Sequence, residues 1–120
     1  MTVLFIFALL KSYNYLKFKQ MIARIWIGKV LTAKRNEFFE YIKQTGLPGL
    51  KETKGNLGVQ ILIKDFEPTS QFMMISFWDS EESIKNSIGP DYTKVRLYPE
   101  DHKYLIGMEP IIHYEVLIQQ

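Results

Sequence analysis

The sequence contains no cysteine in its 120 residues and only two histidines. Without cysteine, the protein cannot form disulfides, thiolate nucleophiles or zinc–thiolate sites. The two histidines, His102 and His113, are separated by ten residues and have no cluster of carboxylates nearby. They do not match the spacing of a recognisable metal site. We therefore expect no metal, and no other cofactor is predicted.

The sequence motifs of nucleotide-binding proteins and of serine hydrolases are also missing. The glycines at positions 46, 49, 55 and 58 do not form a GxGxxG or another phosphate-binding loop. No serine lies in a nucleophile elbow of the GxSxG type. These absences disfavour the enzyme classes that depend on a nucleotide cofactor or on a Ser/His/Asp arrangement.

The net charge of the chain is small and unevenly distributed. Lys and Arg number 15 and Asp and Glu number 13, which gives +2. Three of the lysines, Lys11, Lys17 and Lys19, lie in the first twenty residues, which contain no acidic residue. The remaining residues carry 12 basic and 13 acidic side chains. A near-neutral body has no electrostatic footprint for nucleic acid, so we expect no nucleic-acid partner.

An apolar run at residues 3–10 is followed by basic and tyrosine residues. The run is too short to span a bilayer, which takes about 20 residues. A signal peptide would carry its positive charge before such a run and a small-residue cleavage site after it. We therefore expect a cytoplasmic protein without stable membrane insertion. Residues 1–20 are either a surface anchor with basic flanks or an extension upstream of a natural start at Met21, which we favour.

Residues 21–120 are predicted to form one domain, and four stretches in it are typical of β-strands. Residues 21–30 and 71–78 are rich in β-branched and aromatic side chains, and residues 57–64 alternate apolar side chains with others. Residues 111–118 form the last apolar stretch. The composition, with 47% hydrophobic residues, is sufficient for one core.

Helices are predicted between these strands. Thr32 can cap a helix that Gly46 ends, and Leu47-Pro48-Gly49-Leu50 is predicted to be a turn. A second helix is predicted to begin at Asp79 with Glu82 three residues later, and Gly89-Pro90 interrupts it. Residues 91–98 are predicted to restart a helical segment before Pro99.

The predicted order of strand, helix, strand, strand, helix and strand is the ferredoxin-like βαββαβ arrangement, an α+β fold with an antiparallel four-stranded sheet. Two helices cover only one face of such a sheet, yet the strand at 71–78 is apolar on both faces. Phe72, Met74 and Trp78 lie on one face, and Met73, Ile75 and Phe77 on the other. Because burial of apolar surface stabilises by about 25 cal/mol per Å², we expect a second copy to cover the other face and form a homodimer.

Several segments together resemble the antibiotic biosynthesis monooxygenase (ABM) family of the dimeric α+β barrel superfamily. These are MIARIWIGKV, LPGL, SFWDSEESI, YPEDHKYL and HYEVL, in this order, and the resemblance covers residues 21–117. It implies a homodimer whose two sheets form a barrel, with a pocket in each subunit between the sheet and the helices. The order of the segments is specific for the fold and not for one reaction.

The resemblance implies more than one activity. Some members of the family oxidise polyphenolic or anthrone-like compounds with molecular oxygen and without metal or flavin, some degrade haem, and many have no assigned activity. The haem-degrading members use an asparagine in the first strand and a tryptophan and a histidine on the second helix. Arg24 and Asn86 stand at the first two of these positions, and residues 92–97 contain no histidine. Haem cleavage by that route is therefore disfavoured.

Arg24 and Trp26 lie two residues apart on the first predicted strand and share one face of it. If that face is turned to the helices, Arg24 can hold a phenolate while Trp26 stacks on an aromatic ring. Alternatively, Trp26 is a core residue and Arg24 pairs with a carboxylate such as Glu40. His113 is a candidate catalytic base with Glu115 beside it, and its alternative is a structural role.

Further candidates for substrate binding are Trp78, Tyr98 and His102. Trp78 closes the third predicted strand, and Tyr98 could supply a phenol donor at the mouth of a pocket or pack on the sheet. Asp101 and His102 could serve as base and orienting group, or form a capped turn with exposed charges.

The functional hypothesis is a cofactor-independent monooxygenase for a small aromatic or quinol-like compound, with Arg24 and His113 as catalytic residues. Trp26, Trp78, Tyr98 and His102 are predicted to bind the substrate. The alternative is a non-enzymatic small-molecule-binding or stress-related homodimer on the same scaffold, and a haem-degrading enzyme is the third hypothesis.

Overall fold

The fold is based on an antiparallel sheet with strand β1 (Met21–Leu31) in its middle. The computed structural model describes residues 20–120. On one side β1 pairs with β3 (Thr69–Trp78), which pairs in turn with the edge strand β2 (Asn56–Asp65). On its other side β1 pairs with β4 (Leu105–Met108) and β5 (Ile112–Val116). The predicted ferredoxin-like antiparallel arrangement is confirmed.

The sheet has five strands and not the predicted four, because β4 at 105–108 was not predicted, and the last predicted strand, at 111–118, is β5. Gly107 in β4 is opposite Lys29, and Ile112 in β5 is opposite Ile25, so β4 and β5 follow one another along the same edge of β1. Pro110 lies between them and has no N–H to donate. The backbone N–H of Glu109 still donates to the carbonyl of Ile27 at 3.0 Å. The additional strand therefore leaves the order of the other strands unchanged.

Two consecutive helices follow β1, where one helix and a turn are predicted. A short 3-10 turn at Thr32–Lys34 leads into α2 (Arg35–Gln44), and α3 (Gly46–Glu52) follows almost at once. The predicted turn at 47–50 is therefore wrong. Pro48 is the third residue of α3, within the first turn, where backbone N–H groups have no partner inside the helix. A proline at this position does not prevent a helix.

Helix α4 (Glu81–Ile88) is confirmed, but its cap is Ser80 and not Asp79. The Ser80 hydroxyl accepts from the backbone N–H of Ser83 at 3.1 Å. Gly89, with φ of 102°, ends the helix in a conformation that favours glycine. The predicted helical segment at 91–98 is wrong: residues 89–100 form turns and irregular structure before the 3-10 turn at Asp101–Lys103.

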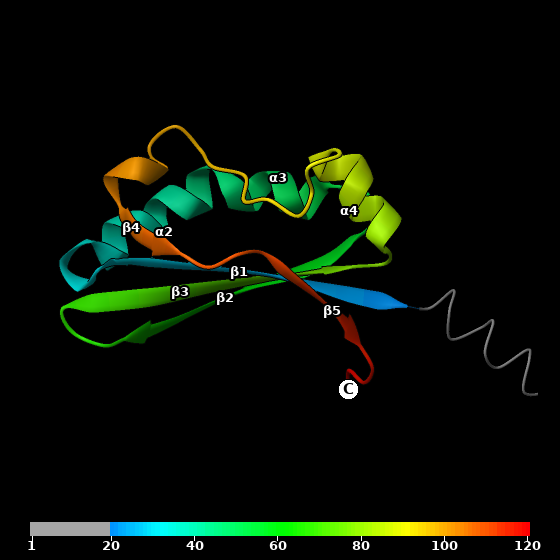
Figure 1. The fold of residues 1–120 in the computed structure, drawn as a ribbon, viewed down its shortest axis with the longest axis horizontal. Coiled ribbons are helices and arrows are strands. Elements are labelled where there is room, and N and C mark those ends of the chain that lie inside the picture. Colours follow the sequence, from blue (N-terminus) through cyan, green and yellow to red (C-terminus); the bar gives the residue numbers. More distant parts are fainter. Residues whose placement is uncertain (1–19) are drawn as a thin grey trace, which may run out of the picture.

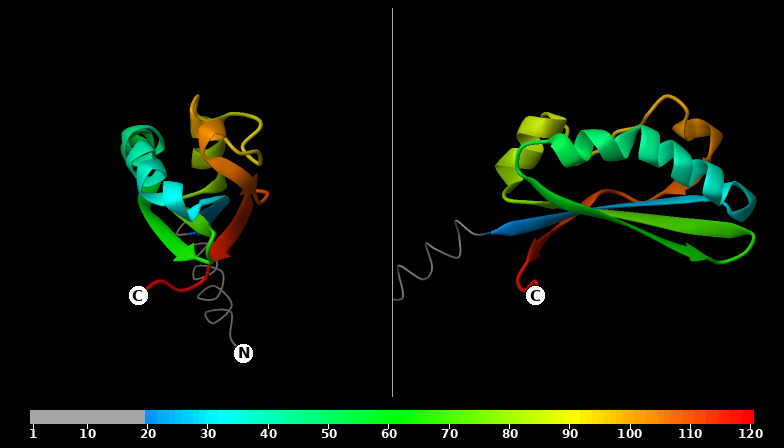
Figure 2. Two further views of the ribbon diagram at one scale, coloured as in Figure 1. Left: turned by 90° about the vertical axis from the view of Figure 1, so that its left-hand side faces the viewer. Right: turned by 180° about the vertical axis from the view of Figure 1, so that it is seen from behind.

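All helices and the segment 89–104 lie on one face of the sheet, as Figure 1 shows. Seen end-on, α2 and α3 stand on one side and the segment 89–104 on the other, above the sheet (Figure 2). No helix or strand of residues 20–120 covers the opposite face (Figures 1 and 2). None of the helices in this part of the chain has the length and apolar character that crossing a membrane requires.

The helix-covered face contains two core clusters. One lies between α2 and the sheet and consists of Val30, Phe38, Ile42 and Phe72. The other lies between α4 and the sheet and consists of Ile22, Trp78 and Ile84. The two clusters lie toward opposite ends of β1 and leave its central residues, Arg24 and Trp26, between them. The predicted extension at residues 1–20 lies, apart from Gln20, outside the described residues.

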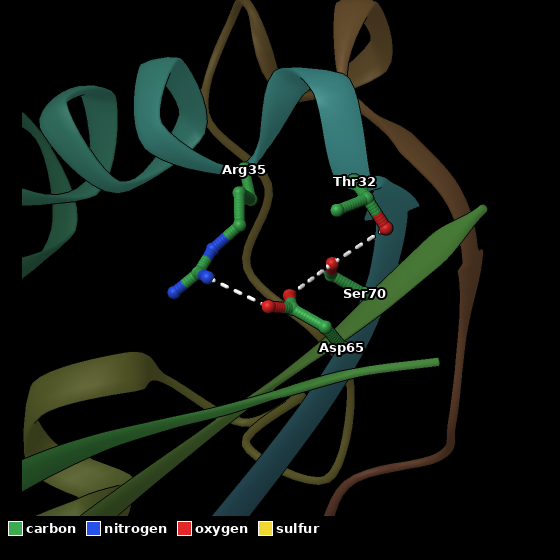
Figure 3. Close-up of polar contacts among 4 residues, drawn as sticks. All are labelled: Thr32, Arg35, Asp65 and Ser70. Carbon is green, nitrogen blue, oxygen red and sulfur yellow. Dashed lines mark hydrogen bonds and ion pairs between the residues drawn. The ribbon is translucent and has the colours of Figure 1, made fainter. Parts of the chain in front are cut away.

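A polar network at one end of the sheet connects the start of the helical region to the β2–β3 hairpin (Figure 3). Arg35 donates to Asp65 Oδ2 at 2.8 Å. The hydroxyl of the fully buried Ser70 hydrogen-bonds with Asp65 Oδ1 at 2.6 Å and with Thr32 Oγ1 at 2.9 Å. Each of the four side chains has at least one partner within the network, although Arg35 Nε is buried without one. The network joins the start of the helical region to the hairpin, which is a structural role.

Candidate functional site

A cavity of about 300 Å³ lies between the sheet, the two consecutive helices and the irregular segment. The sheet contributes Arg24 and Trp26 from β1 and Met74 and Ser76 from β3. These residues are opposite one another in the sheet, since Arg24 is paired with Ser76 and Trp26 with Met74. Successive side chains of a strand point to opposite faces, so all four point toward the helices. The condition under which Arg24 and Trp26 were expected to form a site is therefore met.

The rest of the cavity wall is mostly apolar. Helices α2 and α3 contribute Phe38, Ile42 and Leu50, and the segment after α4 contributes Val95 and Tyr98. Trp26 packs against Phe38 with 6.4 Å between ring centroids. An aromatic and aliphatic wall with a few polar groups is the composition that organic ligands select.

Arg24 is 7% exposed and is held in place by neutral acceptors. One terminal nitrogen, Nη1, donates to the carbonyl of Tyr92 and lies 2.9 Å from His113 Nε2. The other, Nη2, donates to the carbonyl of Lys94 at 3.1 Å. In the helix predicted at 91–98 the N–H of Tyr98 would donate to the Lys94 carbonyl, but it donates to Asp101 Oδ2 at 2.6 Å instead.

The charge of Arg24 has no carboxylate partner among residues 20–120. The alternative partner considered above, Glu40, pairs with Lys43 at 2.7 Å. Burial lowers the pKa of Arg24 to about 10, so the guanidinium is still protonated at neutral pH. A guanidinium has five N–H donors, and three are used in the bonds to Tyr92, His113 and Lys94. Two donors and a full positive charge are left for a ligand.

His113 lies directly across from Arg24 in the β1–β5 pairing. Its Nε2 accepts from Arg24, so the proton of the neutral ring is on Nδ1. Burial, and then the charge of Arg24, lower the pKa of His113 below its ordinary value, which keeps the ring neutral at pH 7. The ring of Tyr92 packs beside it at 5.6 Å. His113 does not line the cavity and contacts Arg24 from beside it.

The structure separates the four predicted substrate-binding residues into two pairs. Trp26 and Tyr98 line the cavity. Trp78 is fully buried in the core, where its Nε1 donates to Ser76 Oγ at 2.9 Å, and His102 is exposed with its Nδ1 2.9 Å from the Pro99 carbonyl. Neither Trp78 nor His102 is among the residues that line the cavity.

Asp101 lines the cavity in place of its neighbour His102. Its side chain is 8% exposed, and its Oδ2 accepts from the backbone N–H of Tyr98 at 2.6 Å. Burial raises the pKa of the Asp101 carboxyl, and the hydrogen bond from Tyr98 opposes that shift in part. The sequence motif at 99–102 indicated an acid and a histidine, but not which of the two faces the cavity.

The alternation of β3 also indicates which of its residues share a face with Trp78 and so lie on the cavity side of the sheet. Ser76 and Met74 are two and four residues before Trp78 in the same strand, so they share its face. Gly46 and Gly49 were assigned to a helix end and a turn, and both line the cavity from α3. Within the part of the chain that the structure describes, no group of three or more His, Asp or Glu side chains could hold a metal ion.

No protein-family model and no curated protein matches the chain. Solved structures do match it. A protein from Bacillus cereus that is named as an antibiotic biosynthesis monooxygenase is 18% identical to this chain, with a TM-score of 0.60. The match covers 83% of this chain and 96% of the other. A Nitrosomonas europaea protein of unknown function, NE2512, is 15% identical with a TM-score of 0.63, covering 86% and 95%.

A third match is the haem degrader MhuD from Mycobacterium tuberculosis, solved with two haems bound in its active site. It is 17% identical with a TM-score of 0.59, and the match covers 82% of this chain and 98% of MhuD. Identities this low establish the fold and not the activity. The chain has the α+β fold that antibiotic biosynthesis monooxygenase proteins share with this haem degrader.

Proposed function

We propose that the protein is a cofactor-independent monooxygenase that converts a small aromatic phenol or quinol-like compound to a quinone. The observation that carries this proposal is Arg24, a buried, protonated and carboxylate-free guanidinium on the wall of an aromatic cavity. Such a group binds the phenolate more strongly than the neutral phenol, because the surroundings of low polarity strengthen the attraction between unlike charges. It therefore favours the deprotonated form, which is the form that reacts with oxygen.

The proton acceptor in this proposal is Asp101, the carboxyl group that lines the same cavity. A raised pKa brings a carboxylate closer in proton affinity to the phenol that it deprotonates. His113 orients Arg24, since its Nε2 lone pair already accepts from the guanidinium and is not available to a substrate proton. Trp26 packs against the aromatic rings of the substrate.

The reaction needs no external reductant. The phenolate transfers one electron to O₂, and the resulting radical pair combines to form a carbon–oxygen bond at the para carbon. The peroxide anion takes back the proton that Asp101 accepted and becomes a hydroperoxide. The hydroperoxide then loses water as its O–O bond breaks and the former C–H proton leaves, which gives a carbonyl group. For 1-naphthol the products are 1,4-naphthoquinone and one water molecule, so the substrate supplies all four electrons that O₂ takes up.

Oxygen uptake by the full chain with 1-naphthol and with anthrone tests this proposal. Under ¹⁸O₂ we expect uptake above the protein-free rate and one ¹⁸O atom in each quinone molecule. Uptake equal to the protein-free rate with both compounds would contradict it. Quinone without label would show oxidation without oxygen transfer.

A second candidate function is binding of the same class of ligand without turnover. It is favoured by the engagement of His113 with Arg24, because this contact removes the histidine from the groups that could act as a base at the cavity. A ligand that binds only the folded state raises the melting temperature by mass action. A rise in Tm with 1-naphthol together with no oxygen uptake would select this candidate. Haem cleavage is not proposed, since no histidine lines the cavity.

We also infer that the open face of the sheet binds a second copy of the chain. Ile25, Ile27 and Met73 line a shallow hollow on this face together with Ile112 and Tyr114, which are 47% and 52% exposed. An apolar sheet face of this kind marks an association surface, and a two-fold axis places the same surface on both partners. Light scattering at micromolar concentration should give the mass of a dimer, and Ile112→Asp should give a monomer. A monomeric wild-type protein would contradict the inference.

A further inference from the structure

Gly49 occupies a position in α3 at which the backbone does not require glycine. The glycines with positive φ are Gly55, Gly58 and Gly89, whereas Gly49 is helical. Glycine is less favourable than alanine inside a helix. A Cβ atom built on Gly49 would have no heavy atom within 4 Å, so packing does not require glycine either.

The neighbouring Gly46 is different. A Cβ atom there would lie 3.4 Å from the ring of Tyr98, which is van der Waals contact, so no open space remains between that ring and the helix at Gly46. Gly46, Gly49, Leu50 and Thr53 follow the spacing of one helix face, and all four line the cavity. Gly49 is exposed, lines the cavity and has open space beside it, so a side chain at this position has room to enter the cavity.

The size of the cavity indicates how many rings it accommodates. A cavity of roughly 150 Å³ holds one benzene molecule. The cavity here, at about 300 Å³, has room for two fused rings. A branched side chain at position 49 would take up much of the space of the second ring.

We propose that Gly49 is a specificity-determining residue, which by its missing side chain admits aromatic anions of two fused rings to the cavity. The inference rests on the proposed function, because that function supplies the aromatic anion held by Arg24. Leucine at position 49 should leave space for one ring only. The effect is therefore a change in the preference between ligands and not a general loss of binding.

The experiment measures the dissociation constants of benzoate and 1-naphthoate, which carry the same anionic group on one and on two rings, by titration calorimetry with the full chain. Wild type should bind 1-naphthoate at least about tenfold more tightly than benzoate, in line with the effect of apolar groups that fill a pocket. Gly49→Leu should reduce this ratio to near one while benzoate affinity changes by less than about threefold. Gly49→Ala should raise the melting temperature and keep most of the ratio.

The matched control is Lys51→Leu, which adds leucine to the same helix at an exposed position that does not line the cavity. It should keep the wild-type ratio. A wild-type ratio in a folded Gly49→Leu protein would overturn the inference and leave the proposed function intact. If Arg24→Gln binds each probe as tightly as wild type does, the proposed function is overturned, whatever the result at Gly49. No binding of either probe by wild type would overturn both.

Discussion

Arg24 and Arg35 both hydrogen-bond to a neighbouring strand of the sheet, but of the two only Arg35 has a carboxylate that neutralises its charge. Arg35 donates to the carboxylate of Asp65 at 2.8 Å, and about a third of each side chain is exposed to solvent. Arg24 is buried and is held by two backbone carbonyls and a neutral imidazole.

The difference between the two arginines separates a structural ion pair from a candidate anion site. The carboxylate and the solvent compensate the charge of Arg35, so the network in Figure 3 has no need of a ligand. Burying an uncompensated charge is unfavourable. At Arg24 an anionic ligand would remove that penalty, which makes the cavity more stable when an anion is bound.

The largest expected effect comes from removing the charge of Arg24. Arg24→Gln should lower kcat/KM for 1-naphthol oxidation by roughly 10³-fold, as the loss of a preorganised oxyanion donor does. Arg35→Gln should change it by less than about twofold. Oxygen electrode rates measured at equal folded fractions check both values. Similar losses in the two variants would remove the distinction between the arginines.

The next largest effect is expected at Asp101. Asp101→Asn should lower kcat/KM by about 10²-fold, the contribution of a general base. The base acts when it is deprotonated, so the wild-type rate should rise with pH through the raised pKa of Asp101. The pH profile of the variant should lack this acidic limb. A variant with the wild-type limb would place the base elsewhere.

A smaller effect is expected from the group that orients Arg24. His113→Leu removes the acceptor for Nη1 and should raise KM by about tenfold, roughly the effect of losing one hydrogen bond to a charged group. His113→Gln retains an oxygen acceptor and should restore most of the affinity. An equal loss in both variants would show that packing against Tyr92 matters and the hydrogen bond does not.

The contribution of His113 to the stability of the fold is expected to depend on pH. Its pKa is lower in the folded protein than the ordinary value of 6.5, so the folded state prefers the neutral ring. The stability that this preference contributes is present above pH 6.5 and is lost as the pH falls through the lower folded pKa. The difference in Tm between wild type and His113→Gln should therefore change below pH 6.5 and stay constant above it.

The smallest effect is expected at the paired arginine. Arg35→Gln should destabilise the fold by roughly 1 kcal/mol or less, the range for a partly exposed ion pair. Urea unfolding checks this value. A loss of several kcal/mol would mean that Asp65 depends on Arg35 more strongly than its exposure suggests.

The sheet could be predicted from the sequence because the relevant signals are local. Alternation placed Arg24 with Trp26 on one face of β1 and Met74 with Trp78 on one face of β3, and the pairing of the strands puts both sets on the helix-covered face. Strand β4 was missed because residues 105–108 carry only a short apolar stretch. Their strand conformation depends on pairing with β1 at 28–30.

The parts of the site that were missed depend on contacts between distant residues. The segment 89–100 has helical spacing, but the carbonyls of Tyr92 and Lys94 are engaged by Arg24, which is about 70 residues away in the chain. Helix α3 was missed because Pro48 and Gly49 are typical of turns, although a proline fits the first turn of a helix. The selection of Asp101 over His102 depends on the direction in which a short turn places each side chain.

The central claim is that Arg24 makes the cavity a site for organic anions, and a comparison of a charged with a neutral ligand of the same shape tests it most directly. Calorimetric titration of the full chain with 1-naphthoate and with 1-naphthamide at pH 7 supplies that comparison. Wild type and Arg35→Gln should bind the carboxylate at least about tenfold more tightly than the amide, and Arg24→Gln should bind the two about equally. Equal affinities in the wild-type protein would contradict the claim.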